Sequence, residues 1–84
     1  MNKRLTIADI AVVILRESGR SGFISEDKEF LGQVFRQCIK RNVMKNSEID
    51  WSERVLSGIE RSQGFIKSEY NGMRTFTIKM SKIF

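Results

Sequence analysis

The chain has 84 residues, a formal net charge of +5 from fifteen Lys and Arg against ten Asp and Glu, one Cys and no His. This length supports a single domain over residues 1–84. The lone Cys38 excludes an internal disulfide, and the absence of His excludes Cys/His zinc sites and His-based catalysis. With no Gly-rich phosphate loop either, we expect no metal, no cofactor and no enzymatic activity.

The first predicted element is a helix over residues 7–18. Thr6 and Asp9 have the spacing of a capping box. Gly19 supplies the left-handed residue that commonly ends a helix. One helical face carries Ile7, Ile10, Ala11, Ile14 and Leu15. The apolar stretch that begins here contains an acid and is too short to cross a bilayer. We therefore expect no secretion signal and no membrane span, and we expect the protein to be cytoplasmic.

A second helix is predicted over residues 26–41, with Ser25 as its N-cap. The segment between Gly19 and Ser25 is too short for another helix and predicts a brief extended stretch whose Phe23 and Ile24 enter the core. The helix itself has the clearest periodicity in the chain. Its apolar stripe consists of Phe30, Leu31, Val34, Phe35, Cys38 and Ile39. Cys38 is therefore expected in the core as a small apolar residue.

A third helix is predicted over residues 48–62, after a loop at residues 42–46. Ser47 and Asp50 again have the form of a capping box. The buried arc is expected to hold Trp51, Val55, Leu56 and Ile59, and the exposed arc Asp50, Glu53, Arg54, Ser57 and Arg61. Trp51 is expected to pack rather than to stack on bases. Gly58 indicates either close approach of another backbone or a tolerated weak point, and the sequence leaves both open.

After Gly64 the apolar period changes to two, which predicts a β-hairpin over residues 65–80 with Asn71-Gly72 at its turn. A two-residue loop would pair Lys67 with Phe76 and mix polar and apolar side chains on one face. A three-residue loop over residues 71–73 places the apolar side chains together instead. Those side chains are Ile66, Tyr70, Phe76, Ile78 and Met80. We therefore expect the three-residue loop, with Gly72 in a bulged turn.

The order of three helices and a hairpin resembles the winged helix-turn-helix family over residues 6–80. The residues that carry the resemblance are VLSGIERSQGFI at 55–66 and the charged strands that follow at 67–79. The resemblance implies an α+β fold, a three-helix winged helix-turn-helix with a C-terminal two-stranded β-hairpin wing. In that family the third helix enters the major groove of DNA, and the wing touches neighbouring phosphates or the minor groove.

Positive charge concentrates where such a fold would meet DNA, in residues 36–45 and 65–84. The candidate DNA-binding residues are Arg54, Ser57 and Arg61 on the third helix, Lys67, Arg74 and Lys79 on the hairpin, and Arg36, Lys40, Arg41 and Lys45 before the third helix. The alternative for the helix is an ordinary solvated face. The alternative for the hairpin is edge-strand charge that prevents aggregation.

The expected function is sequence-specific binding of duplex DNA by a small transcriptional regulator of phage, plasmid or other mobile-element type. Because one recognition helix covers few base pairs, we expect a homodimer. Its interface would use the first helix, the long second helix or the apolar tail residues Ile83 and Phe84. The alternative is a winged-helix interaction module that docks on a host or transcription-machinery protein such as a polymerase, with little or no DNA binding.

Overall fold

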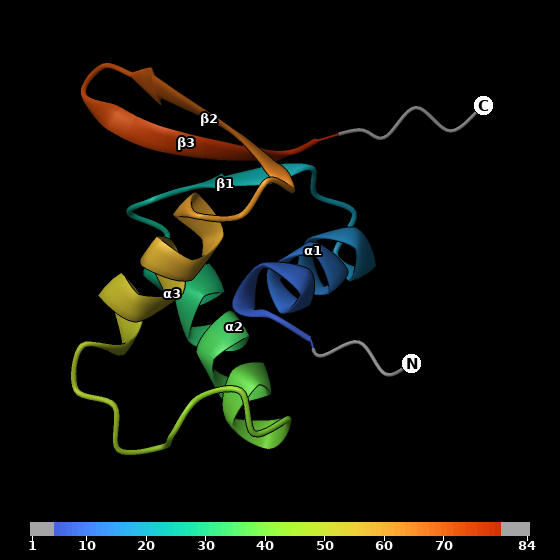
Figure 1. Cartoon of the computed structure of the whole chain (residues 1–84). Helices are drawn as coiled ribbons and strands as arrows, with labels where there is room; N and C mark the ends of the chain where they lie inside the picture. Colours follow the sequence, from blue (N-terminus) through green and yellow to red (C-terminus); the bar gives the residue numbers. More distant parts are fainter. Residues whose placement is uncertain (1–4, 80–84) are drawn as a thin grey trace.

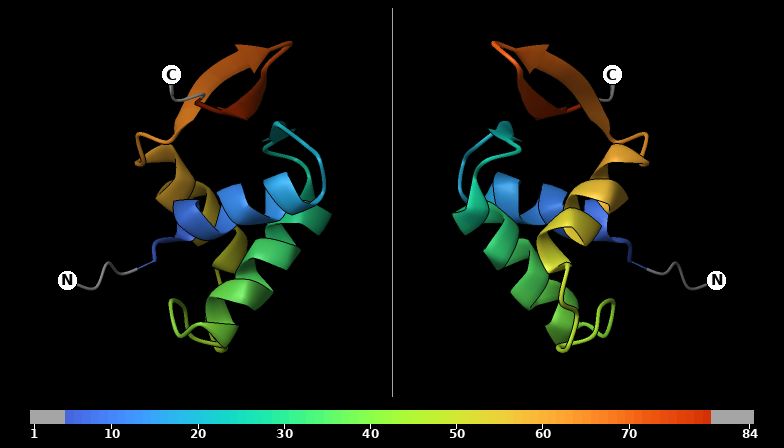
Figure 2. Two further views of the ribbon diagram at one scale, coloured as in Figure 1. Left: turned by 90° about the vertical axis from the view of Figure 1, so that its right-hand side faces the viewer. Right: turned by 90° about the vertical axis from the view of Figure 1, so that its left-hand side faces the viewer.

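The structure, a computed structural model, describes residues 5–79, so the tail residues Ile83 and Phe84 lie outside the described part. Its elements are α1 (Ile7–Glu17), β1 (Gly22–Ile24), α2 (Lys28–Lys40), α3 (Trp51–Glu60), β2 (Phe65–Tyr70) and β3 (Met73–Ile78). Three helices lie on one side of a three-stranded antiparallel sheet of order β1-β3-β2 (Figures 1 and 2). The expected α+β class is confirmed.

The short extended segment before α2 is a strand of the sheet, because β1 pairs with β3 and places Phe23 opposite Phe76. Phe23 is buried, as predicted, but Ile24 is 39% exposed. Successive strand residues point to opposite faces, so two neighbours cannot both enter one core. The prediction that Ile24 is a core residue is therefore wrong.

The hairpin turn has two residues, not three. Tyr70 pairs with Met73, and Lys67 pairs with Phe76, which is the register that the apolar pattern disfavoured. Asn71 and Gly72 have φ values of 52° and 77°, as the type I′ turn of a two-residue hairpin requires. The predicted three-residue loop is wrong because Phe65, and not Ile66, shares the buried face with Phe76 and Ile78, and because Asn-Gly favours a two-residue turn.

The start of α1 follows local sequence. The Thr6 side chain accepts a hydrogen bond from the Asp9 N–H, and the Asp9 carboxylate accepts one from the Thr6 N–H, both at 3.1 Å. This confirms the capping box, and Gly19 after the helix has the expected positive φ of 71°. The helix ends at Glu17, one residue before the predicted end.

The other two helices start later than predicted, for tertiary reasons. The N-cap of α2 is Asp27, which accepts from the Phe30 N–H at 3.1 Å, and not Ser25. Ser25 still belongs to the sheet, where its N–H donates to the carbonyl of Arg74, so the helix begins after it. The predicted capping box before α3 does not form, since residues 45–48 make a turn and the N-cap Asp50 makes no side-chain cap hydrogen bond. The hydrogen bond from Phe30 and the Arg20 guanidinium hold the pKa of Asp27 below its ordinary value.

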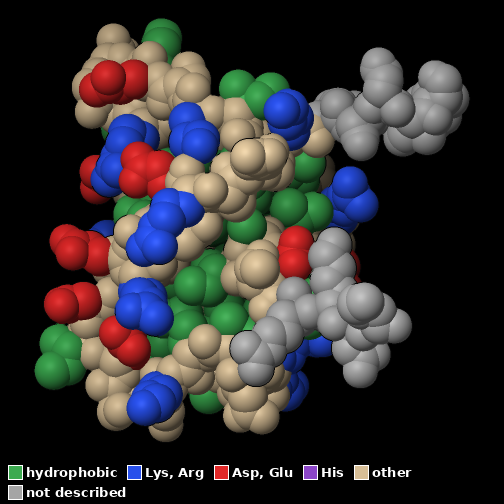
Figure 3. Space-filling model, in the orientation of Figure 1, with side chains coloured by type: hydrophobic (Ala, Val, Ile, Leu, Met, Phe, Trp, Pro, Cys, Tyr) green, Lys and Arg blue, Asp and Glu red, His purple; other side chains and the backbone are tan. Residues whose placement is uncertain are grey.

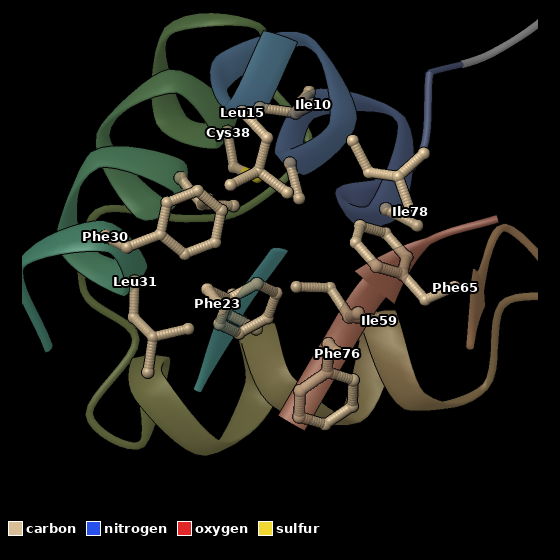
Figure 4. Packing of buried hydrophobic residues seen from close by; sticks show 14 of the residues in the cluster. Ile10, Leu15, Phe23, Phe30, Leu31, Cys38, Ile59, Phe65, Phe76 and Ile78 are labelled. Carbon is tan, nitrogen blue, oxygen red and sulfur yellow. The ribbon is translucent and has the colours of Figure 1, made fainter. Parts of the chain in front are cut away.

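The core centres on aromatic rings contributed by both layers (Figure 4). Phe23 of β1 lies 4.5 Å from Phe30 of α2 and stacks on Phe76 of β3 at 5.0 Å, while Phe65 meets it edge-on at 6.1 Å. Cys38 is fully buried, as predicted, and burial raises the pKa of its thiol to about 11. The sheet and the helices therefore share one core.

The packing of α3 tests the predictions made for Trp51 and Gly58. Trp51 is half-buried and stacks on Phe35 at 5.0 Å, which confirms its packing role. A Cβ on Gly58 would lie 2.9 Å from Cδ1 and 3.1 Å from Cβ of Ile7. Gly58 is therefore a point of close approach between α3 and α1, although the neighbour is a side chain rather than a backbone.

Candidate nucleic-acid interface

One side of α3 faces away from the core. Val55 and Ile59 are buried, whereas Arg54 and Arg61 are exposed and Ser57 is half-buried. These three polar residues, predicted from the helical period, meet in a shallow hollow. Its lining consists of Glu48, Asp50, Glu53, Arg54, Ser57 and Arg61. The exposed face of α3 therefore offers two guanidinium groups and a hydroxyl beside three carboxylates.

Two hairpin cations are tied to the C-terminal end of α3. The Lys67 ammonium donates to the backbone carbonyl of Glu60 at 2.7 Å and to that of Ser62 at 3.5 Å. Such carbonyls lack helical partners and carry the negative end of the helix dipole, so a cation is favourable there. Arg74 donates to the Glu60 carboxylate at 3.1 Å. These contacts link the hairpin to the end of α3.

Five cations follow one another along this side of the molecule. Lys45 and Arg54 line one hollow at the loop before α3, Arg54 and Arg61 line the next, and Lys67 and Arg74 sit at the end of the helix. Figure 3 shows Lys and Arg side chains in a line from the hairpin down over α3, with acidic side chains beside them. We call Lys45, Arg54, Arg61, Lys67 and Arg74 the basic stripe.

The remaining candidates do not share those hollows. Arg36 lines a hollow with Gln33 of α2 and Glu17 of α1, and Arg41 lines another beside Leu5. Lys40 is exposed near the end of α2. Lys79 is exposed at the base of the hairpin, where its N–H donates to Gly64, while Arg74 lies near the turn. The structure thus groups six of the ten predicted residues around α3, namely the basic stripe and Ser57, and separates the other four.

Sequence reasoning missed Glu60, which accepts Lys67 through its carbonyl and Arg74 through its carboxylate. Arg74 lies directly opposite Glu69 in the ladder, so cross-strand pairing would have suggested the wrong partner. The signal that was available is position, because Glu60 ends a helix that a hairpin follows within five residues.

Neither a metal site nor a membrane span is found in the part of the chain that the structure describes. Within residues 5–79 no three His, Cys, Asp or Glu side chains gather in a way that could hold a metal ion. None of the three helices in that range has both the length and the apolar content needed to cross a bilayer.

Comparison with protein-family models, with curated proteins and with solved structures finds no match for this chain.

Proposed function

We propose that this protein binds duplex DNA as a winged helix, with α3 in the major groove and the β2–β3 hairpin as the wing. The observation that carries the proposal is the basic stripe, which runs along the exposed face of α3 and onto the hairpin that follows it. The order of three helices and a C-terminal hairpin supports the winged-helix interpretation. A basic stripe is the electrostatic footprint of a nucleic-acid-binding surface.

The dimensions of α3 suit a major groove. Arg54 and Arg61 are seven residues apart, which is about 10.5 Å along a helix. That separation is close to three base-pair steps of about 3.4 Å each. Ser57 lies between them on the same side of the helix. Arginine bonds bidentately to guanine and serine to several base edges, so the three side chains have the chemistry for base readout.

The carboxylates beside α3 favour sequence-specific over non-specific DNA binding. Asp50 and Glu53 line the same hollow as Arg54, and a carboxylate is repelled by phosphates. It can, however, accept a hydrogen bond from the amino group of cytosine. A mixed face of this kind weakens non-specific binding and supports the sequence-specific variant of the proposal.

Lys67 and Arg74 have a positioning role within the proposal. Both are tied to Glu60, so they hold the hairpin against the end of α3 while part of the Arg74 side chain stays exposed to solvent. We further propose that the protein acts in the cytoplasm as a homodimeric transcriptional regulator of phage, plasmid or other mobile-element type. Two copies of α3 would then read a two-fold symmetric site.

The test is fluorescence anisotropy on duplex DNA over a series of salt concentrations. Replacing both Arg54 and Arg61 by Ala should weaken binding by at least about tenfold and lower the salt slope by about two. The matched control replaces Arg16 and Lys28 by Ala, which removes the same charge from exposed positions on α1 and α2. Equal losses in the two double variants would remove α3 from the interface.

A second candidate function is an interaction module that docks on a larger protein assembly. The observation that favours it is exposed apolar surface, since Ile49 is 88% and Tyr70 71% exposed. The long second helix supports it less than expected, because α2 covers only Lys28–Lys40. Absence of any duplex binding at low salt would favour this function over DNA binding.

A further inference from the structure

The free edge of β2 is an unused strand-pairing surface. The sheet order β1-β3-β2 leaves β2 at one edge, and no strand within residues 5–79 lies on its other side. Only Phe65 of its six residues is buried. The outer part of the hairpin extends away from the helices (Figures 1 and 2). Such an edge presents backbone donors and acceptors to a further strand.

The hydrogen-bond pattern shows which residues face outward. In an antiparallel pair, alternate residues direct both backbone groups to the neighbouring strand. Gly64 accepts from the Lys79 N–H, and Tyr70 and Met73 flank the two-residue turn, so the even-numbered residues of β2 bond to β3. Phe65, Lys67 and Glu69 therefore direct their N–H and C=O groups to the open edge.

The outward edge has a self-complementary sequence. Around Ser68 the residues read apolar, cation, serine, anion, apolar, from Ile66 to Tyr70. We propose that β2 pairs antiparallel with β2 of a second copy of this chain, about a two-fold axis at Ser68. Lys67 then lies opposite the partner's Glu69, and Ile66 opposite the partner's Tyr70. The two sheets join into one of six strands.

Charge and hydrogen bonding select this register against its neighbours. A shift of one residue places an outward-facing residue opposite an inward-facing one, so the ladder loses its hydrogen bonds. A shift of two residues places Lys67 opposite the partner's Lys67, or Glu69 opposite the partner's Glu69. Like charges directly opposite each other destabilise a strand pair. Among these neighbouring registers, only the one centred on Ser68 satisfies both conditions.

The side chains on both faces of β2 are also compatible with pairing to a second copy. Ile66 and Tyr70 lie on the face away from the helices and are 53% and 71% exposed, so pairing would cover apolar surface. Lys67 uses its ammonium group for two backbone carbonyls, which leaves a third donor for the partner's Glu69.

The opposite edge of the sheet does not offer the same surface. Strand β1 has only three residues, and the carbonyl of Ile24 already accepts from the Asp27 N–H at 3.0 Å. The turn into α2 thus occupies part of that edge. A second copy is consequently expected on β2 and not on β1.

The experiment measures self-association in the absence of DNA by sedimentation equilibrium, so its outcome is separate from that of the DNA-binding proposal. Glu69→Lys alone and Lys67→Glu alone each place like charges in both cross-strand pairs, and each should weaken dimerisation by at least about tenfold. Mixed in equal amounts, the two variants restore both pairs, and they should form a heterodimer about as tight as the wild-type dimer. The controls Glu26→Lys and Lys28→Glu make the same charge changes at exposed positions away from β2.

A second variant tests the backbone contacts. Glu69→Pro removes an outward N–H but leaves the donors to β3, and an edge strand tolerates proline in that orientation. It should abolish dimerisation while thermal melting by circular dichroism shows a folded chain. A wild-type protein that is monomeric at millimolar concentration would overturn the proposal. A dimer unaffected by Glu69→Pro, or folded charge variants that do not associate when mixed, would also overturn it.

Discussion

The two ends of the β2–β3 hairpin have the same backbone ladder and opposite environments. At its base, Phe65, Phe76 and Ile78 are buried against the helices and Phe23. In its outer half, Tyr70 beside the turn is exposed, and Ile66, although it lies at the base, is exposed because its side chain points away from the helices. The difference shows that an apolar residue in a strand does not by itself indicate burial. Helices lie beneath only the base of the hairpin. The outer half is held by its backbone hydrogen bonds and by the turn.

Loss of an aromatic ring at the base should have the largest effect on stability. Phe76→Ala removes a fully buried ring that stacks on Phe23, and we expect the free energy of unfolding to fall by about 3–5 kcal/mol. Tyr70→Ala in the outer half should change it by no more than about 0.5 kcal/mol. Urea denaturation of both variants measures the contrast. Similar losses would mean that the outer half is packed as tightly as the base.

A glycine substitution in β1, beside the base of the hairpin, should have the next largest effect. A Cβ on Gly22 would lie 2.5 Å from the carbonyl oxygen of Phe76, a backbone atom that cannot move aside easily. We expect Gly22→Ala to cost about 1–3 kcal/mol of unfolding free energy. Gly64→Ala is the control, since its nearest neighbour would be Oγ of Ser62 at 3.9 Å. Equal stability of the two variants by thermal melting would contradict the tight β1–β3 contact.

The turn at the outer end should be sensitive to backbone conformation alone. Gly72 has a φ of 77°, and a Cβ added there would have no neighbour within 4 Å, so Gly72→Ala meets strain without collision. The expected loss of unfolding free energy is about 1 kcal/mol. Chemical denaturation gives the value, and Gly72→Asn should lose less because asparagine tolerates positive φ. An Ala variant as stable as wild type would argue against the type I′ turn.

The cap of α2, beside the base, should show a pH-dependent contribution. Because the pKa of Asp27 is lowered in the folded state, its carboxylate stabilises the fold above the unfolded pKa of about 3.9 and loses that contribution as pH falls through the folded pKa. Asp27→Ala should cost about 1 kcal/mol at neutral pH and less at pH 3. Urea denaturation at both values checks this, with the exposed Glu26→Ala as control. A loss that does not shrink at low pH would exclude the carboxylate as its source.

The smallest effect is expected from the ion pair between Arg74 and Glu60, since both side chains are about half exposed to solvent. A double-mutant cycle of Arg74→Ala and Glu60→Ala should give a coupling energy below about 1 kcal/mol, decreasing with salt. A coupling of several kcal/mol would indicate that the outer half is anchored to α3 more firmly than solvent exposure implies.

The sequence predicts those parts of the fold that short-range patterns determine. It also predicts the part of the candidate interface that lies on α3. The helical period correctly grouped Arg54, Ser57 and Arg61, because residues three or four apart share a helix face. The period did not reveal that Lys67 contacts the end of α3, because that contact depends on the path of the hairpin. Arg36 and Arg41 lie apart from the stripe because the orientation of the exposed side of α2 relative to α3 is set by tertiary packing, which the helical period does not report.

Features that depend on a few neighbouring residues follow from the amino-acid order alone: the capping box of Thr6 and Asp9, the buried stripe with Cys38, and the position of the turn at Asn71-Gly72, though not its length. The packing of the whole chain was needed to establish which half of the hairpin is buried, which residue caps α2 and which edge of the sheet stays open. Those outcomes depend on segments far apart in the chain, whose contacts local periodicity and turn chemistry do not encode.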